Sequence, residues 1–123
     1  MTEDDEELAS WEEWTERLGK YFDMDGNEIT LREWGDMYNH PERRIVKQDH
    51  VGRYFVSTVL LGVDHSFTPE GPPILFETMI FDNKGVQGQG LGEDVFCDRY
   101  TNKDAALAGH DQAVERARRK DFS

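Results

Sequence analysis

Several features that define large protein classes are missing from this sequence. Cys97 is the single cysteine among 123 residues, so no disulfide can form within the chain, as is usual for proteins of a reducing cytoplasm. No apolar run approaches the roughly 20 residues that a membrane-spanning helix needs. The acidic N-terminus, TEDDEEL, is the opposite of a basic signal peptide. We therefore expect a cytoplasmic protein that makes no membrane contact.

Basic residues are scarce as well. The 14 Lys and Arg residues face 26 Asp and Glu residues, which gives a formal net charge of −12 and argues against direct binding to a nucleic-acid backbone. Residues 1–16 contain eight of the acids and no base. We expect residues 1–7 to form a disordered acidic lead. Residues 8–123 should fold as one domain, because seven Phe, four Tyr and three Trp supply enough core material.

Two apolar runs predict the centre of a sheet. In residues 54–61 and 74–81, apolar side chains occupy both alternating faces, which is typical of strands covered on two sides, or covered on one and used for self-association on the other. Residues 93–100 are more polar and predict an edge strand, after a glycine-rich hairpin loop. An Asp-Gly-Asn turn predicts a small hairpin in residues 21–31. Residues 40–49 fit either a turn of helix or an edge strand.

Helical periodicity and capping residues predict three helices. The first spans residues 8–18, the second begins after a capping box of Thr30 and Glu33, and the third spans residues 103–120 with Thr101 as its cap. Their expected apolar faces are Leu8, Trp11 and Leu18; Leu31, Trp34 and Met37 or Tyr38; and Leu107, His110, Val114 and Ala117. The predicted fold class is α+β: a small antiparallel sheet of three or more strands, a C-terminal helix packed on one face, and short N-terminal helices.

The loop after the first apolar run concentrates polar chemistry. Asp64 and His65 follow the strand directly, and three prolines stiffen the segment up to residue 73. A carboxylate beside an imidazole can bind a ligand or act as an acid–base pair. Alternatively, Asp64 caps the turn and His65 hydrogen-bonds the loop backbone.

Glu77 and His110 complete the set of candidate ligand-binding residues. Glu77 lies inside an apolar strand, where an ionised carboxylate needs a partner; Arg53, Arg99, Ser57 or His110 would serve. His110 lies on the core-facing stripe of the last helix, which suits a hydrogen-bonded core histidine or a ligand contact.

A convergence of these residues would resemble a mixed nitrogen and oxygen metal site. Such a cluster would contain His65, Glu77 and His110, with Asp64 or Asp98 nearby. None of the spacings matches a recognised metal motif. We therefore predict no metal site, no cofactor and no catalytic residue.

Four blocks of the chain resemble a known family: DGNEITLREW, VSTVLLGVDHSF, GPPILFETMIF and RYTNKDAALAGHDQAV. In order and spacing, over about residues 21–115, they are similar to a family of small proteins found in actinobacteria and their phages. The resemblance implies an actinobacterial or phage origin, with the host cytoplasm as the location if a phage encodes the chain. It implies nothing about catalytic residues.

The leading hypothesis is a non-catalytic accessory protein that acts by protein–protein interaction. Strands that are apolar on both faces also suggest a homodimer. The alternative is small-ligand binding or sequestration by the loop of residues 64–73 together with Glu77. A metal-dependent hydrolase using His65 and Glu77, and an acidic mimic of DNA, are further alternatives.

Overall fold

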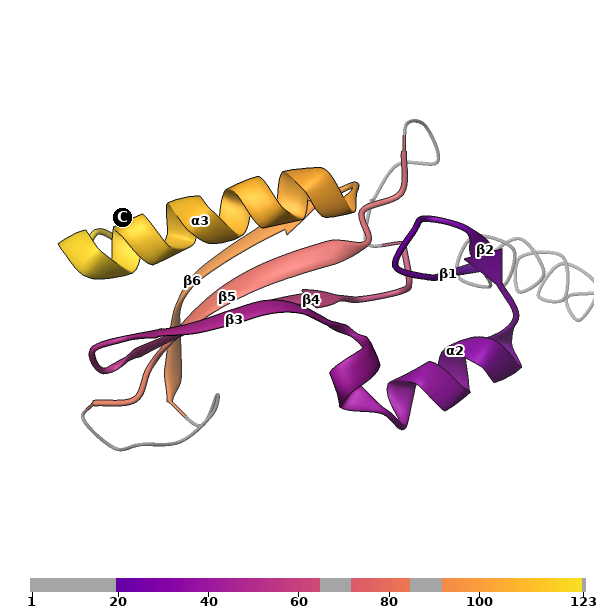
Figure 1. Cartoon of the computed structure of the whole chain (residues 1–123), viewed down its shortest axis with the longest axis horizontal. Coiled ribbons are helices and arrows are strands. Elements are labelled where there is room, and N and C mark those ends of the chain that lie inside the picture. Colours follow the sequence, from indigo (N-terminus) through magenta and orange to yellow (C-terminus); the bar gives the residue numbers. More distant parts are fainter. Residues whose placement is uncertain (1–19, 65–71, 85–91, 123) are drawn as a thin grey trace, which may run out of the picture.

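The structure is a computed structural model that describes residues 20–64, 72–84 and 92–122. Within this part of the chain, a four-stranded antiparallel sheet carries one long helix on one face, and a small hairpin and a short helix lie at one end (Figure 1). The elements are β1 (Tyr21–Phe22), β2 (Glu28–Ile29), α2 (Leu31–Tyr38), the 3₁₀ helix η1 (Pro41–Arg43), β3 (Ile45–Val51), β4 (Tyr54–Leu60), β5 (Phe76–Asp82), β6 (Glu93–Tyr100) and α3 (Lys103–Arg119). The predicted α+β fold is confirmed.

The sheet is a meander in the order β3-β4-β5-β6. Thr58 of β4 lies opposite Thr78 of β5, and Val56 lies opposite Ile80. These residues face α3 and are fully buried. Because side chains alternate along a strand, the residues between them point to the opposite face of the sheet.

Small residues let α3 lie close against the sheet. Its buried residues are Ala106, Gly109, His110, Ala113 and Ala117. A Cβ atom on Gly109 would collide with the ring of Tyr100, so glycine is required where the helix passes β6. The close packing places the one polar residue of this stripe, His110, directly on the strands.

The N-terminal elements form as the sequence predicts. In the β1–β2 hairpin, the carboxylate of Asp23 accepts hydrogen bonds from the backbone of Asp25 and Asn27. Thr30 and Glu33 form the predicted capping box at the start of α2. These elements share a core with the end of the sheet, made of Met37, Leu60, Leu75, Phe76 and Ala106.

Residues 40–49 form η1 and the first part of β3. Strand β3 adds a fourth strand to the sheet and is joined to β4 by a tight hairpin, in which Gly52 has a φ of +60°. This is the left-handed region that glycine adopts without steric cost.

Two predicted boundaries need correction. The cap of α3 is Asn102, whose side chain accepts from the backbone of Ala105 at 2.8 Å, and not Thr101. Strand β5 begins at Phe76 rather than at residue 74, because the backbone N–H of Ile74 donates to Asp64 instead of to a neighbouring strand. The predicted helix of residues 8–18 and the loop of residues 85–91 lie outside the described residues. Among the described helices, none is long and apolar enough to cross a membrane.

Candidate functional site

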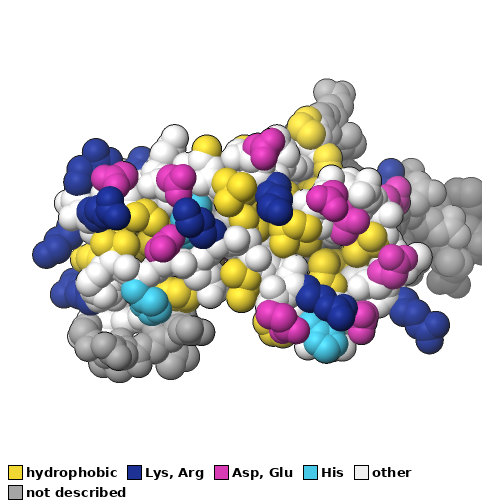
Figure 2. Space-filling view, in the orientation of Figure 1, with side chains coloured by type: hydrophobic (Ala, Val, Ile, Leu, Met, Phe, Trp, Pro, Cys, Tyr) yellow, Lys and Arg dark blue, Asp and Glu magenta, His cyan; other side chains and the backbone are white. Residues whose placement is uncertain are grey.

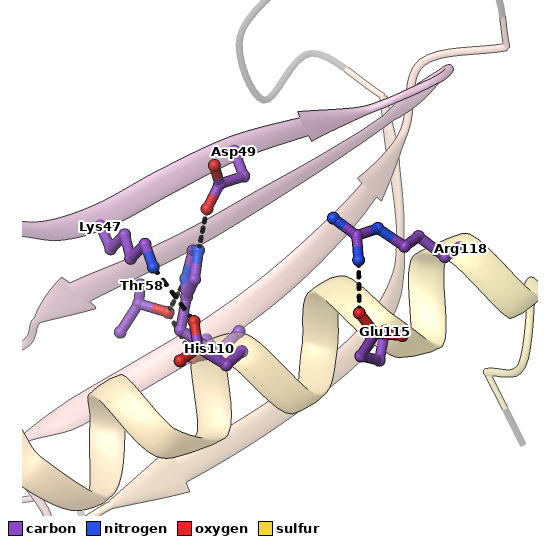
Figure 3. A network of polar contacts seen from close by, with 8 residues as sticks. Lys47, Asp49, Thr58, His110, Glu115 and Arg118 are labelled. Atoms are coloured by element: carbon purple, nitrogen blue, oxygen red, sulfur yellow. Dashed lines mark hydrogen bonds and ion pairs between the residues drawn. The ribbon is translucent and has the colours of Figure 1, made fainter.

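A network of polar side chains, buried except at its Asp49 end, crosses the interface between α3 and the sheet (Figure 3). His110 is fully buried. Its Nδ1 lies 2.7 Å from the hydroxyl oxygen of Thr58, and its Nε2 lies 2.8 Å from a carboxylate oxygen of Asp49 on β3. The hydroxyl groups of Thr58 and Thr78 are in turn 2.5 Å apart. The contacts therefore run from β3 through α3 to β4 and β5.

The direction of these hydrogen bonds follows from the chemistry of the groups. An ionised carboxylate only accepts hydrogen bonds, so Nε2 of His110 carries a hydrogen and donates it to Asp49. In a neutral imidazole, Nδ1 then accepts from the hydroxyl of Thr58, whose oxygen accepts from Thr78. Each polar atom of the buried imidazole is satisfied.

Tyr100 of β6 lies near Thr78 at the far end of this network. Burial raises the pKa of the Tyr100 phenol, and the neighbouring Thr78 hydroxyl opposes that shift. The hydrogen-bonded side chains connect three strands of the sheet, β3, β4 and β5, with the helix. We refer to Asp49, His110, Thr58 and Thr78 as the polar chain.

The order carboxylate, imidazole, hydroxyl is the order of a catalytic triad, but the geometry opposes catalysis here. The hydroxyl groups of Thr58 and Thr78 lie beneath α3 and are fully buried. A nucleophile must reach its substrate, so neither threonine can attack one while α3 is in place. The polar chain instead fixes the position of α3 on the sheet.

An ion pair reinforces the same interface at the surface. The amine of Lys47 on β3 lies 3.1 Å from the carboxylate of Asp111 on α3 (Figure 3). Both side chains are exposed, so the pair adds little stability compared with the buried groups.

Glu77 lies on the opposite face of the sheet from His110. It is the neighbour of Thr78 on β5 and pairs across the sheet with Arg99 of β6. The guanidinium of Arg99 donates to its carboxylate at 2.9 Å. Of the partners that the sequence allowed for Glu77, the structure selects Arg99. Glu77 and His110 do not converge on one ligand, so the metal cluster considered from the sequence is not assembled around this pair.

Cys97 is close to this ion pair on β6. Cys97 is exposed overall, but partial burial of its thiol raises the thiol pKa, and the negative charge of Glu77 raises it further. A thiol with a raised pKa is a poor nucleophile near neutral pH. This face of the sheet therefore lacks an activated thiol within the described residues.

Asp64 stabilises the turn before β5 by a hydrogen bond to its backbone. Its carboxylate accepts a hydrogen bond from the backbone N–H of Ile74 at 2.9 Å, which agrees with the turn-capping alternative. His65 lies outside the described residues. Among the residues that the structure does describe, no group of three or more His, Cys, Asp and Glu side chains is arranged to hold a metal ion.

The most exposed large apolar side chains lie at the α2 end of the molecule. Leu31 is 62% exposed and Tyr38 is 52% exposed. With Gly35 between them, they occupy positions i, i+4 and i+7 and so share one side of α2. We call Leu31, Gly35 and Tyr38 the α2 stripe. Met37 is the residue of α2 that is buried in the core, so only part of the helix's apolar surface is covered.

Aromatic rings support the α2 stripe from within. The ring of Trp34 lies 5.1 Å from that of Tyr21 and 5.2 Å from that of Tyr38. The Trp34 indole also donates to the backbone oxygen of Leu61 at 3.3 Å. The guanidinium of Arg44 sits 4.6 Å from the centre of the Tyr38 ring. Tyr38 is therefore held in place although half of it is exposed.

No family model, no curated protein and no solved structure matches this chain.

The sequence identified His110 but not its partners. Thr58 and Thr78 occur in apolar strands, where threonine is a common residue, and Asp49 lies in a segment of undecided structure. The composition of α2 in the sequence does indicate an exposed apolar surface. Leu31, Trp34, Met37 and Tyr38 make half of an eight-residue helix large and apolar, which is more than one buried stripe accommodates.

Proposed function

We propose that this chain is a non-catalytic accessory protein that binds a protein partner through the α2 stripe. The observation that carries the proposal is the exposure of Leu31 and Tyr38 on one side of a short, capped helix. Exposed apolar side chains that lie on the same side of one element can form the kind of patch that marks an interaction site. Tyr38 and the neighbouring Trp34 and Arg44 also belong to the residue types that dominate binding energy at interfaces.

The surroundings of the α2 stripe fit a protein surface better than a small-molecule site. Charged and histidine side chains surround the apolar residues at this end of the molecule (Figure 2). In this region Asp36 forms an ion pair with Arg43, and His40 contacts the carboxylates of Asp36 and Glu42. An apolar centre with a polar rim is the usual anatomy of a protein interface. The third exposed apolar side chain, Ile45, follows Arg44 directly in sequence.

The resemblance to actinobacterial and phage proteins sets the proposed biological context. We place the protein in the cytoplasm of an actinobacterial cell, as a product of that cell or of its phage. There it would act by binding a protein partner rather than by chemistry. The enclosed hydroxyl groups of Thr58 and Thr78 support a structural role for the polar chain.

Site-specific photo-crosslinking in the cells that produce the protein tests this proposal. A photoreactive phenylalanine replaces Tyr38 in one variant and Gln112, an exposed residue of α3, in a control. We expect a discrete crosslinked adduct from position 38 after irradiation and none from position 112. Absence of an adduct at position 38, or the same adducts at both positions, would contradict the proposal.

A further inference from the structure

We propose that the partner seated on the α2 stripe is a second copy of this chain, with the two α2 helices antiparallel and crossing at Gly35. This inference rests on the proposed function, because it names the occupant of the same surface. Three observations support it: the position of Gly35, the symmetry of the stripe, and the charges along its edge.

Gly35 has no explanation within the described chain. Glycine in the interior of a helix is less favourable than alanine, yet a Cβ atom at Gly35 would meet nothing within 4 Å. Gly35 is also in ordinary helical conformation, since it is not among the glycines with positive φ. A glycine on an exposed helix face permits the backbone of another element to approach closely. Gly35 lies in the middle of the α2 stripe, where a second helix would cross.

The α2 stripe is complementary to itself. In an antiparallel pair related by a two-fold axis, each contact occurs twice, with residue i of one copy against residue j of the other. With the axis between Trp34 and Gly35, Leu31 of one copy meets Tyr38 of the second copy. The leucine then packs on the exposed part of an aromatic ring at both ends of the contact, and the two glycines adjoin at its centre.

Charges along the edge of α2 are complementary in the same arrangement. Arg32 and Asp36 are four residues apart and run along one edge of the helix, beside Gly35. In the two-fold pair these edges adjoin, so that Arg32 of each copy lies beside Asp36 of the other. Asp36 is 66% exposed and contacts Arg43 at 3.0 Å. No ion pair of Arg32 occurs within the described part of the chain, which leaves its charge available to a second copy.

The size of the surface sets the strength of this dimer. A helix of eight residues is about 12 Å long and about 10 Å across. One side of such a helix is smaller than the roughly 800 Å² that each partner buries in a stable interface. The dimer should therefore be weak and should form with rising protein concentration.

Disulfide trapping tests the antiparallel pairing. In a Cys97→Ser background, Arg32→Cys protein is mixed with Asp36→Cys protein, because the proposed pairing sets these positions beside each other and neither substitution adds bulk at Gly35. The matched control mixes Arg32→Cys with Gln112→Cys, which places a thiol on the exposed side of α3. Under mild oxidation of concentrated protein, mass spectrometry should find a disulfide between positions 32 and 36 in the first mixture and none between positions 32 and 112 in the control. No disulfide-linked dimer in either mixture, or equal amounts in both, would overturn the proposal.

A charge exchange tests the arrangement by sedimentation, without oxidation. In an Arg43→Gln background, which removes the internal partner of Asp36, Arg32→Asp and Asp36→Arg should each weaken dimerisation by about tenfold, the effect of two exposed ion pairs. The double variant should restore it, because the exchanged charges again meet across the axis. A double variant as weak as the single ones would overturn the antiparallel pairing.

A further variant separates binding from folding. Gly35→Ala should raise the melting temperature of the dilute monomer and at the same time weaken dimerisation, because its methyl group lies at the crossing. Unchanged dimerisation would contradict close approach at Gly35. If the purified chain remains monomeric at every concentration while position 38 gives an adduct with another protein in cells, the second-copy proposal fails and the proposed function stands. If neither occurs, both fail.

Discussion

At the scale of single residues, the polar chain shows how a buried histidine keeps a hydrogen-bond partner for each ring nitrogen. Each nitrogen of His110 has a partner, Asp49 on one side and Thr58 on the other. A buried polar group without a hydrogen-bond partner costs free energy. Loss of either Asp49 or Thr58 would therefore leave one nitrogen of the buried imidazole unpaired. The network also makes the position of α3 specific, since a shift of the helix along the sheet would break both contacts.

Replacing Thr58 with valine tests how much the hydrogen bond between Thr58 and His110 contributes to stability. The substitution keeps the shape of the side chain but leaves Nδ1 of His110 without a partner, so the free energy of unfolding should fall by about 1–3 kcal/mol. Asp49→Asn is the control, because an amide oxygen still accepts from Nε2, and it should cost less than about 1 kcal/mol. Urea unfolding measures both. Equal stability of Thr58→Val and the unmodified chain would show that the polar chain contributes nothing.

Cys97 provides a pH-dependent prediction on the other face of the sheet. Burial and then the charge of Glu77 raise the pKa of its thiol, so the thiolate fraction at a given pH is below that of an ordinary cysteine. Alkylation by iodoacetamide at pH 8 should be slower than that of glutathione and should accelerate as the pH rises. Glu77→Gln lowers the thiol pKa and should speed the reaction. The same rate before and after this substitution would refute the role of Glu77.

Only one member of the polar chain, His110, could be identified from the sequence. His110 was recognisable because it interrupts an apolar stripe of a predicted helix. Thr58 and Thr78 were not, because their meeting depends on the register between β4 and β5 and on where α3 lies. Register and helix placement are tertiary properties, and local residue patterns do not carry them.

At the scale of elements, strongly periodic segments were predicted well and ambiguous ones were not. The central strands β4 and β5 and the helix α3 were identified from their apolar patterns. Strand β3 was left undecided because its residues alternate only weakly between polar and apolar. It becomes a strand by pairing along β4, in which Ser57 lies opposite Gln48 and Phe55 opposite His50. Its strand character therefore comes from its neighbour.

The start of α3 offers a test of the corrected cap. Both Thr101 and Asn102 are good capping residues, and the sequence alone does not say which one precedes the first helical turn. Because Asn102 accepts from the backbone of Ala105, Asn102→Ala should lower the free energy of unfolding by about 1 kcal/mol. Thr101→Ala should cost clearly less. Thermal unfolding compares the two, and the reverse order would restore Thr101 as the cap.

At the scale of the whole molecule, the structure changes where a partner is expected. The sequence suggested self-association through a sheet face, because the strands are apolar on both sides. On the face away from α3, however, Phe55 is only 3% exposed, and its ring lies 4.7 Å from that of His50 and 6.4 Å from that of Phe81. The apolar side chains Leu31 and Tyr38 of α2 are far more exposed than Phe55. A homodimer remains a prediction, with its contact placed at the α2 stripe.

The prediction of fold class succeeded because two signals agreed. The apolar strands required a cover on at least one face, and a helix with an apolar stripe was available to provide it. The exposure of the α2 stripe could not be predicted in the same way. Whether an apolar side chain is covered depends on which elements reach it, and Leu31 and Met37 differ in this respect although they belong to the same short helix.

Chemical footprinting of Tyr38 measures whether a protein covers the α2 stripe in cells. Hydroxyl radicals oxidise exposed rings, and Tyr38 is the exposed tyrosine of the described chain; Phe122, a half-buried ring near the end of α3, is the reference. Oxidation of Tyr38 relative to Phe122 should be strong in dilute purified protein and much weaker inside the producing cells, where a protein covers the α2 stripe. Equal relative oxidation of Tyr38 in both settings would contradict the account.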